Sequence, residues 1–390
     1  MIENKNIQEK VVIAGLQTKD ENPKLFEEDI QEMVMLCATA GAEVVEVFIQ
    51  KRLHPESSTF LGAGKLHEIK GLMRSKGVKT LVIDAHLSPG QVRNIEELVN
   101  GKVLDRGQVI LDIFSLHAKT VEARVQVELA QMHTLYPRLT HAWTHFSQQV
   151  GGIGTRGPGE KQLEVDRRLV QKKIRDLKQR LSKIEKNRDV QRKGRSSVFK
   201  VSLVGYTNAG KSSILNALSG SDVLVEDKLF ATLDTSTRRT YIPAIGSVVI
   251  SDTVGFLRKL PHHLVASFRS TLRDVSEAQL LLIVLDASSE FFDQHLATVN
   301  EVLHDLDADR IPSILVFNKI DLADDPFVRK QLHISYPDAI FVSSFNKENM
   351  AQLKEHIGEF VVHYQKKQKE ERIIRARTRQ SVHGTAHHLV

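Results

Sequence analysis

The most constraining feature of this chain is a short glycine-containing segment between two predicted elements of different kinds. Residues 205–212 read GYTNAGKS and match the pattern GxxxxGK[ST]. The apolar run at 198–204 predicts a strand before this segment, and the run at 213–218 predicts a helix after it. Backbone N–H groups at such a turn lie at the positive end of a helix, which favours phosphate groups. The segment therefore predicts a phosphate-binding loop in a domain of alternating strands and helices.

Two side chains of this loop have the chemistry to bind a triphosphate. Lys211 supplies a point charge to the β and γ phosphates, and the hydroxyl of Ser212 is a ligand for Mg²⁺. We therefore expect Mg²⁺ as the cofactor. The nucleotide-binding residues expected in this segment are Gly205, Tyr206, Thr207, Asn208, Ala209, Gly210, Lys211, Ser212 and Ser213.

A second motif indicates which base is bound. Asn318, Lys319, Ile320 and Asp321 directly follow the apolar run at 311–317. The carboxylate of Asp321 can accept hydrogen bonds from both N1–H and the 2-amino group of guanine, whereas adenine would leave that carboxylate unpaired. An unpaired buried charge is costly, so the motif favours GTP and GDP over ATP. We expect Asn318 to brace the loop and the stem of Lys319 to cover the base.

A third motif is suited to the γ phosphate. Asp252, Thr253, Val254 and Gly255 follow the predicted strand at 247–251. We expect the Asp252 carboxylate to reach Mg²⁺ through water and the Gly255 N–H to meet the γ phosphate. The neighbour of this glycine is Phe256, whose ring cannot orient an attacking water. The sequence therefore predicts a GTP hydrolase that is slow alone and is stimulated by a partner that completes the site.

The segment between these motifs supplies a candidate second hydroxyl for Mg²⁺. Thr232 is that candidate, although Thr235 and Thr237 are competitors on spacing alone. Release of this hydroxyl from Mg²⁺ after hydrolysis would let the loop become disordered, as in a conventional nucleotide-dependent switch. The expected catalytic residues are Lys211, Thr232 and Gly255, and the nucleotide-binding residues expected in this segment are Phe230, Ala231, Thr232, Leu233 and Asp234.

The remaining pattern predicts an α/β fold with several parts. β-branched runs at 11–16, 43–49 and 80–84 alternate with helical periodicity, which indicates a parallel sheet. Apolar residues at 170, 174, 177, 181 and 184 predict a coiled coil or helical hairpin, and the polar run at 187–197 predicts a hinge. Near-continuous apolarity at 280–285 predicts a doubly wound sheet that is buried on both faces. The expected parts are an N-terminal parallel α/β domain at 1–150, a glycine-rich loop with a basic helical linker at 151–197, a C-terminal P-loop nucleotide-binding domain at 198–365, and a basic flexible tail at 366–390.

The positive charge is concentrated in two segments. Residues 160–195 contain 14 Lys plus Arg against 6 Asp plus Glu, and residues 361–390 contain 7 against 2, in a chain of net charge +6. These excesses of +8 and +5 leave about −7 for the rest of the chain, which favours a polyanionic partner such as RNA over an evenly basic surface. A solvated charged helix face is the alternative. The RNA-binding candidates are Arg156, Lys161, Arg167 and Arg168.

Other features predict the compartment. The chain has a single cysteine, Cys37, which fits a reducing environment. Residues 1–10 are polar, and the longest apolar run, at 280–285, has the length of a strand and not of a membrane span. We therefore expect a cytoplasmic protein without a membrane span, and we expect a monomer.

Several motifs together resemble the HflX family of translation-type GTPases. They are GGIGTRGPGEKQLE at 151–164, DRR at 166–168, LGAGK at 61–65, LSPGQ at 87–91 and QVELA at 126–130. The resemblance extends over residues 11–345 and includes 230–234, which supports Thr232 over its neighbours. It also implies that Ser343, Ser344 and Phe345 contact the base, although Ser344 stands where alanine is usual.

The resemblance implies a factor that binds the large ribosomal subunit and separates stalled or idle ribosomes, with its N-terminal domain and glycine loop directed toward ribosomal RNA. Two alternatives remain open. One is an RNA-remodelling enzyme with a second nucleotide site in residues 1–150, where the turn at 61–65 combines glycine with lysine but lacks a full phosphate loop. The other is a GTPase that assembles ribosomes, because such an enzyme would share every nucleotide motif.

Overall fold

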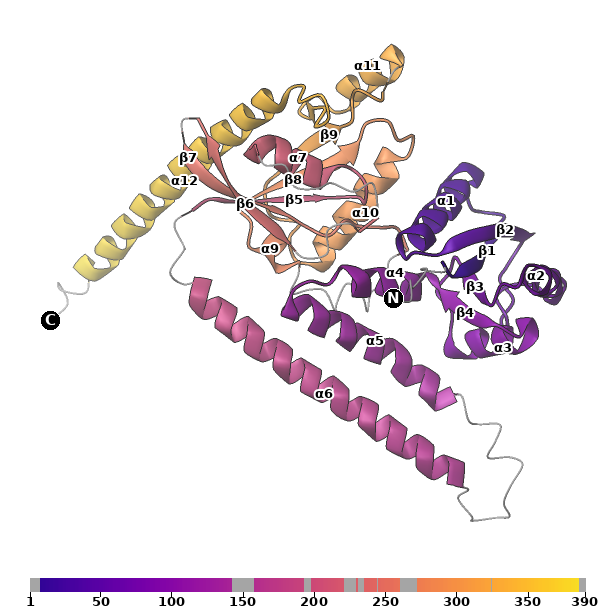
Figure 1. Ribbon diagram of the computed structural model, residues 1–390. Coiled ribbons are helices and arrows are strands. Elements are labelled where there is room, and N and C mark those ends of the chain that lie inside the picture. The colour runs from indigo at the N-terminus through magenta and orange to yellow at the C-terminus, as the bar shows by residue number, and fades with distance from the viewer. Residues whose placement is uncertain are drawn as a thin grey trace, which may run out of the picture.

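The computed structural model consists of two α/β domains joined by a long helical hairpin (Figure 1). It describes residues 8–141, 158–192, 198–220, 229–230, 235–243, 245–259, 272–323 and 325–385. This architecture confirms the predicted fold class, with a parallel N-terminal sheet, a charged helical linker and a doubly wound C-terminal sheet. No helix of the described ranges combines the length and apolarity needed to cross a membrane.

The N-terminal domain is a parallel sheet of four strands with helices on both faces. The strand order is β2-β1-β3-β4. Helices α1 and α4 pack on one face, and α2 and α3 pack on the other. The strands are β1 (Lys10–Thr18), β2 (Glu43–Arg52), β3 (Thr80–Ile83) and β4 (Lys102–Asp105), and the helices are α1 (Pro23–Thr39), α2 (Ala63–Lys76), α3 (Pro89–Val99) and α4 (Arg106–His117).

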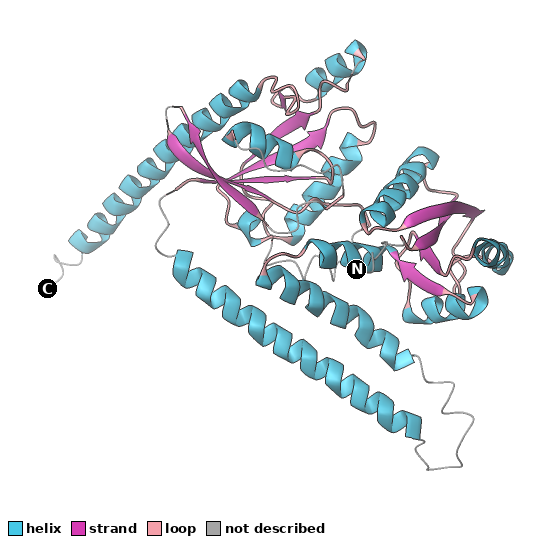
Figure 2. Ribbon diagram, viewed as in Figure 1, coloured by secondary structure: helices cyan, strands magenta, loops and turns pink. Residues whose placement is uncertain are grey.

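The helical hairpin consists of α5 (Val121–His141) and α6 (Pro158–Arg192), which lie side by side (Figure 2). Leu177 of α6 is 1% exposed and packs against Val125 and Leu129 of α5, because the apolar residues of both helices repeat at helical spacing. Two expectations are corrected here. The first arm of the hairpin lies within residues 1–150, which we assigned to the N-terminal domain. Residues 187–192 of the polar run expected to form a hinge belong to α6, which continues to Arg192, and residues 193–197 lie outside the described residues.

The C-terminal domain contains a sheet of six strands in the order β10-β9-β8-β5-β7-β6. All neighbours are parallel except β6 and β7. Helices α7 and α12 cover one face, and α9 and α10 cover the other. The strands are β5 (Lys200–Gly205), β6 (Ser236–Ile242), β7 (Gly246–Asp252), β8 (Leu280–Asp286), β9 (Ser313–Asn318) and β10 (Ile340–Phe341), and the helices are α7 (Lys211–Ser219), α9 (Arg273–Ser276), α10 (Phe292–Asp305), α11 (Pro326–Ser335) and α12 (Met350–Thr385).

The last helix includes most of the segment that we expected to form a tail at 366–390. Helix α12 continues through residue 385 and extends beyond the sheet (Figure 1). Its first turns are anchored because Leu353, Ile357 and Val361 are buried against the sheet. A helix anchored at one end extends by adding one backbone hydrogen bond per residue, and residues 366–385 contain no proline that would stop it.

The two domains share a continuous apolar core. Phe114 of α4 and Phe230 lie edge to face, with ring centroids 4.8 Å apart and an interplanar angle of 79°. The α1 and α4 face of the N-terminal sheet and the α10 face of the C-terminal sheet belong to the same buried cluster. The N-terminal domain is therefore packed directly against the predicted nucleotide-binding domain.

Candidate nucleotide-binding site

The predicted phosphate loop connects β5 to α7. Strand β5 ends at Gly205, and α7 begins at Lys211. Gly210 caps this helix with a φ of +87°, and a Cβ atom there would lie 2.2 Å from Nδ2 of Asn318. Only glycine fits this position, because the backbone needs positive φ and the space is filled. The first amides of α7 are left without helical carbonyl partners, which suits an anion.

Lys211 is buried within this loop. It is 7% exposed, and its Nζ donates to the carbonyl oxygens of Gly205 at 3.2 Å and Tyr206 at 2.7 Å. Burial lowers the pKa of Lys211 to about 8, and the nearby carboxylate of Asp252 opposes that shift. A phosphate would restore the charged form by pairing with the ammonium group.

This lowered pKa predicts a pH dependence of GTP binding. Below pH 8 the ammonium is already formed, so binding needs no proton, whereas above pH 8 binding must take up one proton. We expect the dissociation constant for GTP to rise about fourfold between pH 7 and pH 8.5. Calorimetry in buffers of different ionisation enthalpy should detect proton uptake at the higher pH. An affinity that is constant up to pH 8.5, without proton uptake, would contradict the role of Lys211.

The oxygen ligands proposed for Mg²⁺ converge at the start of α7. The Ser212 hydroxyl donates to Oδ2 of Asp252 at 2.5 Å, although the two residues lie 40 positions apart in the chain. Thr253 is buried and donates to the carbonyl oxygen of Leu203 at 2.7 Å, which holds the end of β7 beside β5. A hydroxyl and a carboxylate form a donor set that fits Mg²⁺.

The backbone after Asp252 is paired to the phosphate loop. Thr207 N–H donates to the Phe256 carbonyl oxygen at 2.9 Å, and Phe256 N–H donates to the Gly205 carbonyl oxygen at 3.1 Å. A Cβ atom on Gly255 would lie 2.8 Å from Cα of Thr207 and 3.0 Å from Nζ of Lys211. Glycine is therefore required for this close approach. Val254 and Phe256, which flank Gly255, are both buried.

Asn318 ties two loops of the site together. Its Nδ2 donates to the carbonyl oxygen of Ala209 at 2.9 Å, and its Oδ1 accepts from the N–H of Ser344 at 3.0 Å. The side chain is completely buried. The phosphate loop and the loop at 343–345 are consequently held at one end of the sheet by a single amide.

Asp321 has a carboxylate oxygen that no other described residue satisfies. Its Oδ1 is buried and has no hydrogen-bond partner within the described part of the chain. Buried charged acceptors are normally paired, so this oxygen points to a missing donor such as the N–H groups of a purine. Lys319 is kept beside this position by an ion pair between its Nζ and Oδ2 of Asp286 at 2.7 Å, and its φ is +62°.

The other predicted residues of the base site occupy different environments. Ile320 is buried and its N–H donates to the carbonyl oxygen of Val342 at 3.3 Å. Ser343 is buried, and its Oγ accepts from the N–H of Asn346 at 3.0 Å. Phe345 is 86% exposed. Asn208, in the phosphate loop, has a φ of +58° and is exposed, while Ser213 lies in the first turn of α7.

Phe230 begins the segment predicted to contact the nucleotide. Its ring is buried in the domain interface against Phe114, because burial of two aromatic rings lowers the free energy of the folded state. Four predicted neighbours lie outside the described residues, namely Ala231, Thr232, Leu233 and Asp234.

The groups of the turn at 61–65 that could bind a phosphate already have partners within the protein. The N–H of Gly62 donates to Oε1 of Gln50 at 2.8 Å, and Lys65 pairs with Glu68 at 2.7 Å. The amide and the ammonium that a phosphate would need are thus both engaged within the N-terminal domain.

The RNA-binding candidates lie on or beside α6. Arg156 is outside the described residues, as is the side chain of Lys161. Arg167 lies over the ring of Tyr136, with 5.5 Å from Cζ to the centroid, and Arg168 pairs with Glu164 at 2.6 Å. Both arginines are exposed. An exposed ion pair is worth little, so Arg168 can exchange its partner for a phosphate at low cost.

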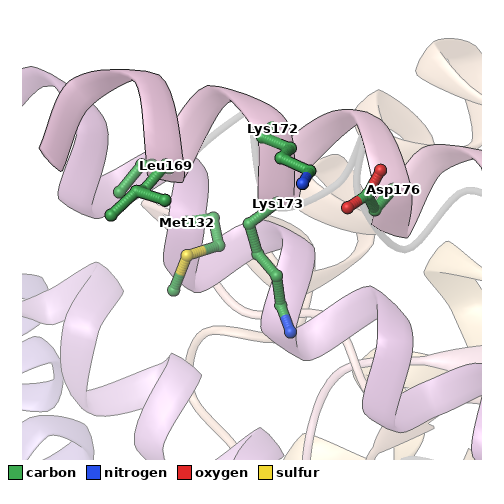
Figure 3. A pocket seen from close by; sticks show the side chains of 6 residues that line it. Met132, Leu169, Lys172, Lys173 and Asp176 are labelled. Carbon is green, nitrogen blue, oxygen red and sulfur yellow. The ribbon is translucent and has the colours of Figure 1, made fainter. Parts of the chain in front are cut away.

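The two helices of the hairpin also enclose a shallow, mostly apolar hollow of about 380 Å³ (Figure 3). Met132 of α5 and Leu169 of α6 line it, together with Lys172 and Lys173. Lys173 pairs with Glu128 across the hairpin at 2.8 Å, which fixes the helices in register.

Several residues that contact the site were missed in the sequence. Asp286 forms an ion pair with Lys319. Its position at the end of an apolar strand was the feature of the sequence that could have indicated a role at the site. Glu32 accepts a hydrogen bond from the Tyr206 hydroxyl at 2.6 Å, and Arg258 donates its N–H to that hydroxyl at 3.1 Å. The basic pair of residues 258–259, just after Gly255, could have been noted from the sequence.

Comparison with known protein families matches three consecutive stretches of the chain. Residues 27–115 match the family described as GTP-binding GTPase N-terminal. Residues 117–195 match the GTP-binding GTPase middle region, and residues 200–319 match the 50S ribosome-binding GTPase family. The middle region begins close to α5, in agreement with a hairpin whose first arm lies before residue 150.

Similar proteins span most of the chain. The GTPase HflX of Flavobacterium psychrophilum is 44% identical over 383 residues, which cover 93% of this chain and 92% of that protein. The GTPase HflX of Escherichia coli is 46% identical over 300 residues, covering 76% of this chain and 70% of that protein. The crystal structure of the SsGBP and GDP complex has a TM-score of 0.52 at 23% identity, covers 92% of this chain and 99% of that chain, and supports the fold alone. The predicted resemblance is confirmed, and the chain belongs to the HflX family of GTPases.

Proposed function

We propose that this GTPase binds the large ribosomal subunit and separates stalled or idle 70S ribosomes, and that GTP hydrolysis times its release. The observation that carries the proposal is the union of a guanine-nucleotide site and a basic hairpin in one chain whose residues 200–319 match a 50S ribosome-binding GTPase family. Ribosomal RNA is a polyanion, and a factor that must bind and leave needs a step that changes its affinity.

In this proposal each residue of the nucleotide site contacts a particular part of GTP or Mg²⁺. The amides of residues 205–213 and the ammonium of Lys211 bind the phosphates, and Asp321 selects guanine. Ser212 and, through water, Asp252 would hold Mg²⁺, and Thr232 would join them when GTP is bound. When bound, Mg²⁺ neutralises charge on the β and γ phosphate oxygens. The buried, unpaired oxygen of Asp321 supports the assignment of the base, and the bond between Ser212 and Asp252 supports that of the metal.

The hairpin and the glycine-rich segment contact ribosomal RNA in this proposal. Arg156, Lys161, Arg167 and Arg168 supply cations, and Arg167 and Arg168 are exposed on the first half of α6. Lysines and arginines that contact phosphates add affinity without reading sequence. We place the protein in the cytoplasm as a monomer, where ribosomes are its partner.

A ribosome sedimentation experiment tests this function. Purified 70S ribosomes are incubated with the protein and a nonhydrolysable GTP analogue, and the particles are separated by sedimentation. We expect 70S particles to dissociate with the analogue, because the factor then stays in its ribosome-bound state. The same mixtures with GTP should release phosphate faster with ribosomes than without, since Phe256 cannot orient water unaided. Lys211→Ala serves as the nucleotide-free control.

Three outcomes decide between the functions. Dissociation that needs both the analogue and an intact Lys211 supports ribosome splitting. Binding to immature large particles alone, with 70S ribosomes unchanged, supports ribosome assembly instead. If 70S particles stayed intact and ribosomes did not change the rate of phosphate release, the ribosome would not be the partner of this GTPase.

A further inference from the structure

The phosphate loop contains a buried hydroxyl that no other described residue satisfies. Thr207 is 7% exposed, and its Oγ1 has no hydrogen-bond partner within the described part of the chain. Burial of an unpaired hydroxyl costs free energy, and threonines usually avoid this cost by bonding to nearby backbone groups. The neighbouring Thr253 does so, since its hydroxyl donates to the carbonyl oxygen of Leu203 at 2.7 Å. The Thr207 hydroxyl is therefore available to a ligand of the phosphate loop.

Two other hydroxyls of the described residues are buried without a partner, but they lie elsewhere in the domain. Ser202 is in the middle of β5, and Thr240 is in β6, the edge strand of the sheet. Neither residue belongs to a nucleotide motif. An unpaired hydroxyl does not indicate a ligand by itself, so the position of Thr207 in the phosphate loop decides its meaning.

Thr207 lies beside the two groups that we assign to the γ phosphate. A Cβ atom on Gly255 would lie 2.8 Å from both Cα and Cγ2 of Thr207, and 3.0 Å from Nζ of Lys211. The Lys211 ammonium and the Gly255 amide are the groups expected to bind the γ phosphate. The methyl and the hydroxyl of threonine are attached to the same Cβ, so a rotation about χ1 exchanges their positions. The hydroxyl can therefore reach the place where the γ phosphate binds.

The Thr207 hydroxyl also has the chemistry that the residues around Gly255 lack. Hydrolysis requires a group that orients the attacking water next to the γ phosphate. Val254 and Phe256 flank Gly255, and neither side chain carries a polar atom. A threonine hydroxyl offers one donor and two acceptor positions. It can donate to a γ phosphate oxygen and accept a hydrogen bond from a water at the same time.

We infer that the side chain of Thr207 is a catalytic group for GTP hydrolysis. Its hydroxyl donates to a γ phosphate oxygen and accepts a hydrogen bond from the attacking water, which it orients toward the phosphorus. The water oxygen forms a bond to the γ phosphorus while the bond from that phosphorus to the β–γ bridging oxygen breaks. The bridging oxygen leaves on GDP with the electron pair. One water proton passes to a γ phosphate oxygen, so the products are GDP and inorganic phosphate, and Thr207 is unchanged.

The role of Thr207 depends on GTP hydrolysis by this chain and not on its partner. Each part of the test is made without ribosomes. Failure of the test would therefore leave the proposed separation of ribosomes untouched, and intact 70S particles would say nothing against Thr207.

The test compares Thr207→Val with the wild-type full-length chain. Valine keeps the β-branched shape of the side chain and removes the hydroxyl. Single-turnover hydrolysis at saturating GTP and Mg²⁺ should slow about thirtyfold, as expected for the loss of one hydrogen bond to a charged group. The dissociation constant for GDP should stay within about twofold, because GDP has no γ phosphate. Thr207→Ser restores the hydroxyl and should hydrolyse GTP within about threefold of the wild-type rate.

Two further measurements distinguish this role from a structural one. The affinity of Thr207→Val for a nonhydrolysable GTP analogue should fall about fivefold while its affinity for GDP does not, since the hydrogen bond to the γ phosphate is lost. The melting temperature without nucleotide should be unchanged or higher, because valine removes a buried hydroxyl that has no partner among the described residues. A structural role would instead lower the melting temperature and weaken both nucleotides alike.

The matched control is the same substitution at Thr240. The hydroxyl of Thr240 is also buried without a partner in the described ranges, but it lies in the edge strand β6 and outside every nucleotide motif. Thr240→Val should leave the hydrolysis rate within about twofold of wild type, because the effects of distant sites are independent. A loss in this control equal to that of Thr207→Val would overturn the role of Thr207.

Three further results would also overturn it. They are wild-type hydrolysis by a folded Thr207→Val variant, a loss of GDP affinity that parallels the loss of rate, and hydrolysis by Thr207→Ser that is as slow as that by Thr207→Val. If Thr207→Val does not fold, Thr207→Ala replaces it and is compared with Thr207→Ser, since these two variants differ by the hydroxyl alone. The serine variant should then be about thirtyfold faster, and equal rates would refute a catalytic role of the hydroxyl.

Discussion

Lys211→Ala should remove measurable binding of GTP and GDP. The ammonium is the only positive side chain inside the described phosphate loop, and it points to the carbonyl oxygens of Gly205 and Tyr206. Loss of a buried charge opposite a triphosphate costs several kcal/mol, and about 2.7 kcal/mol already weakens binding hundredfold. Calorimetry with GDP and with a nonhydrolysable GTP analogue, both with Mg²⁺, measures the loss.

A matched control comes from the N-terminal domain. Lys65→Ala removes the lysine of the other turn that combines glycine and lysine, where Lys65 pairs with Glu68. Its GTP affinity should equal that of wild type. Circular dichroism and thermal melting confirm that both variants are folded. Unchanged GTP affinity in a folded Lys211→Ala variant would refute the assignment of the phosphate site.

Asp321→Asn should change which purine is bound. The wild-type carboxylate can accept from two N–H groups of guanine, and its Oδ1 is buried with no partner among the described residues. An amide offers one acceptor and one donor, so it loses a guanine contact and can donate to the additional carbonyl of xanthine. We expect GDP affinity to fall about hundredfold, consistent with the loss of charged hydrogen bonds, and XDP binding to become measurable.

The control for this variant is the same substitution four residues later. Asp325 caps α11 by accepting the N–H of Phe327 at 2.8 Å, and asparagine is an equally good cap. Asp325→Asn should bind GDP as wild type does and should not bind XDP. Wild-type preference for GDP over XDP in the Asp321→Asn variant would show that another group selects the base.

The nucleotide site is the part of the molecule that could be predicted best. Each motif is a run of four to eight residues in which a strand end, a turn and a helix start are determined by neighbours in the chain. Gly210 and Gly255 are required by local backbone geometry and close packing. Parallel strands then bring the motifs together, since their carboxyl ends lie at one edge of the sheet.

Other features depended on neighbours far along the chain. Phe230 was predicted to contact the nucleotide, and its packing against Phe114, 116 residues earlier in the chain, could not be read from the sequence. The residues of helix α5 were assigned to the N-terminal domain at 1–150, but their apolar side faces α6. The segment after residue 365 is basic and polar, and its helical state follows from the buried first turns of α12.

The sequence by itself determined that the chain folds as an α/β GTPase, because the residues of each nucleotide motif act through their own backbone turn. Only the tertiary structure showed that the N-terminal domain contacts the segment that follows Gly255. Arg258 and Asp29 lie 229 residues apart, and their charges carry no sign of this pairing until the two domains are packed. Burial decides how much this ion pair matters. An exposed pair contributes little to stability, whereas breaking a buried pair leaves an unpaired charge and is costly.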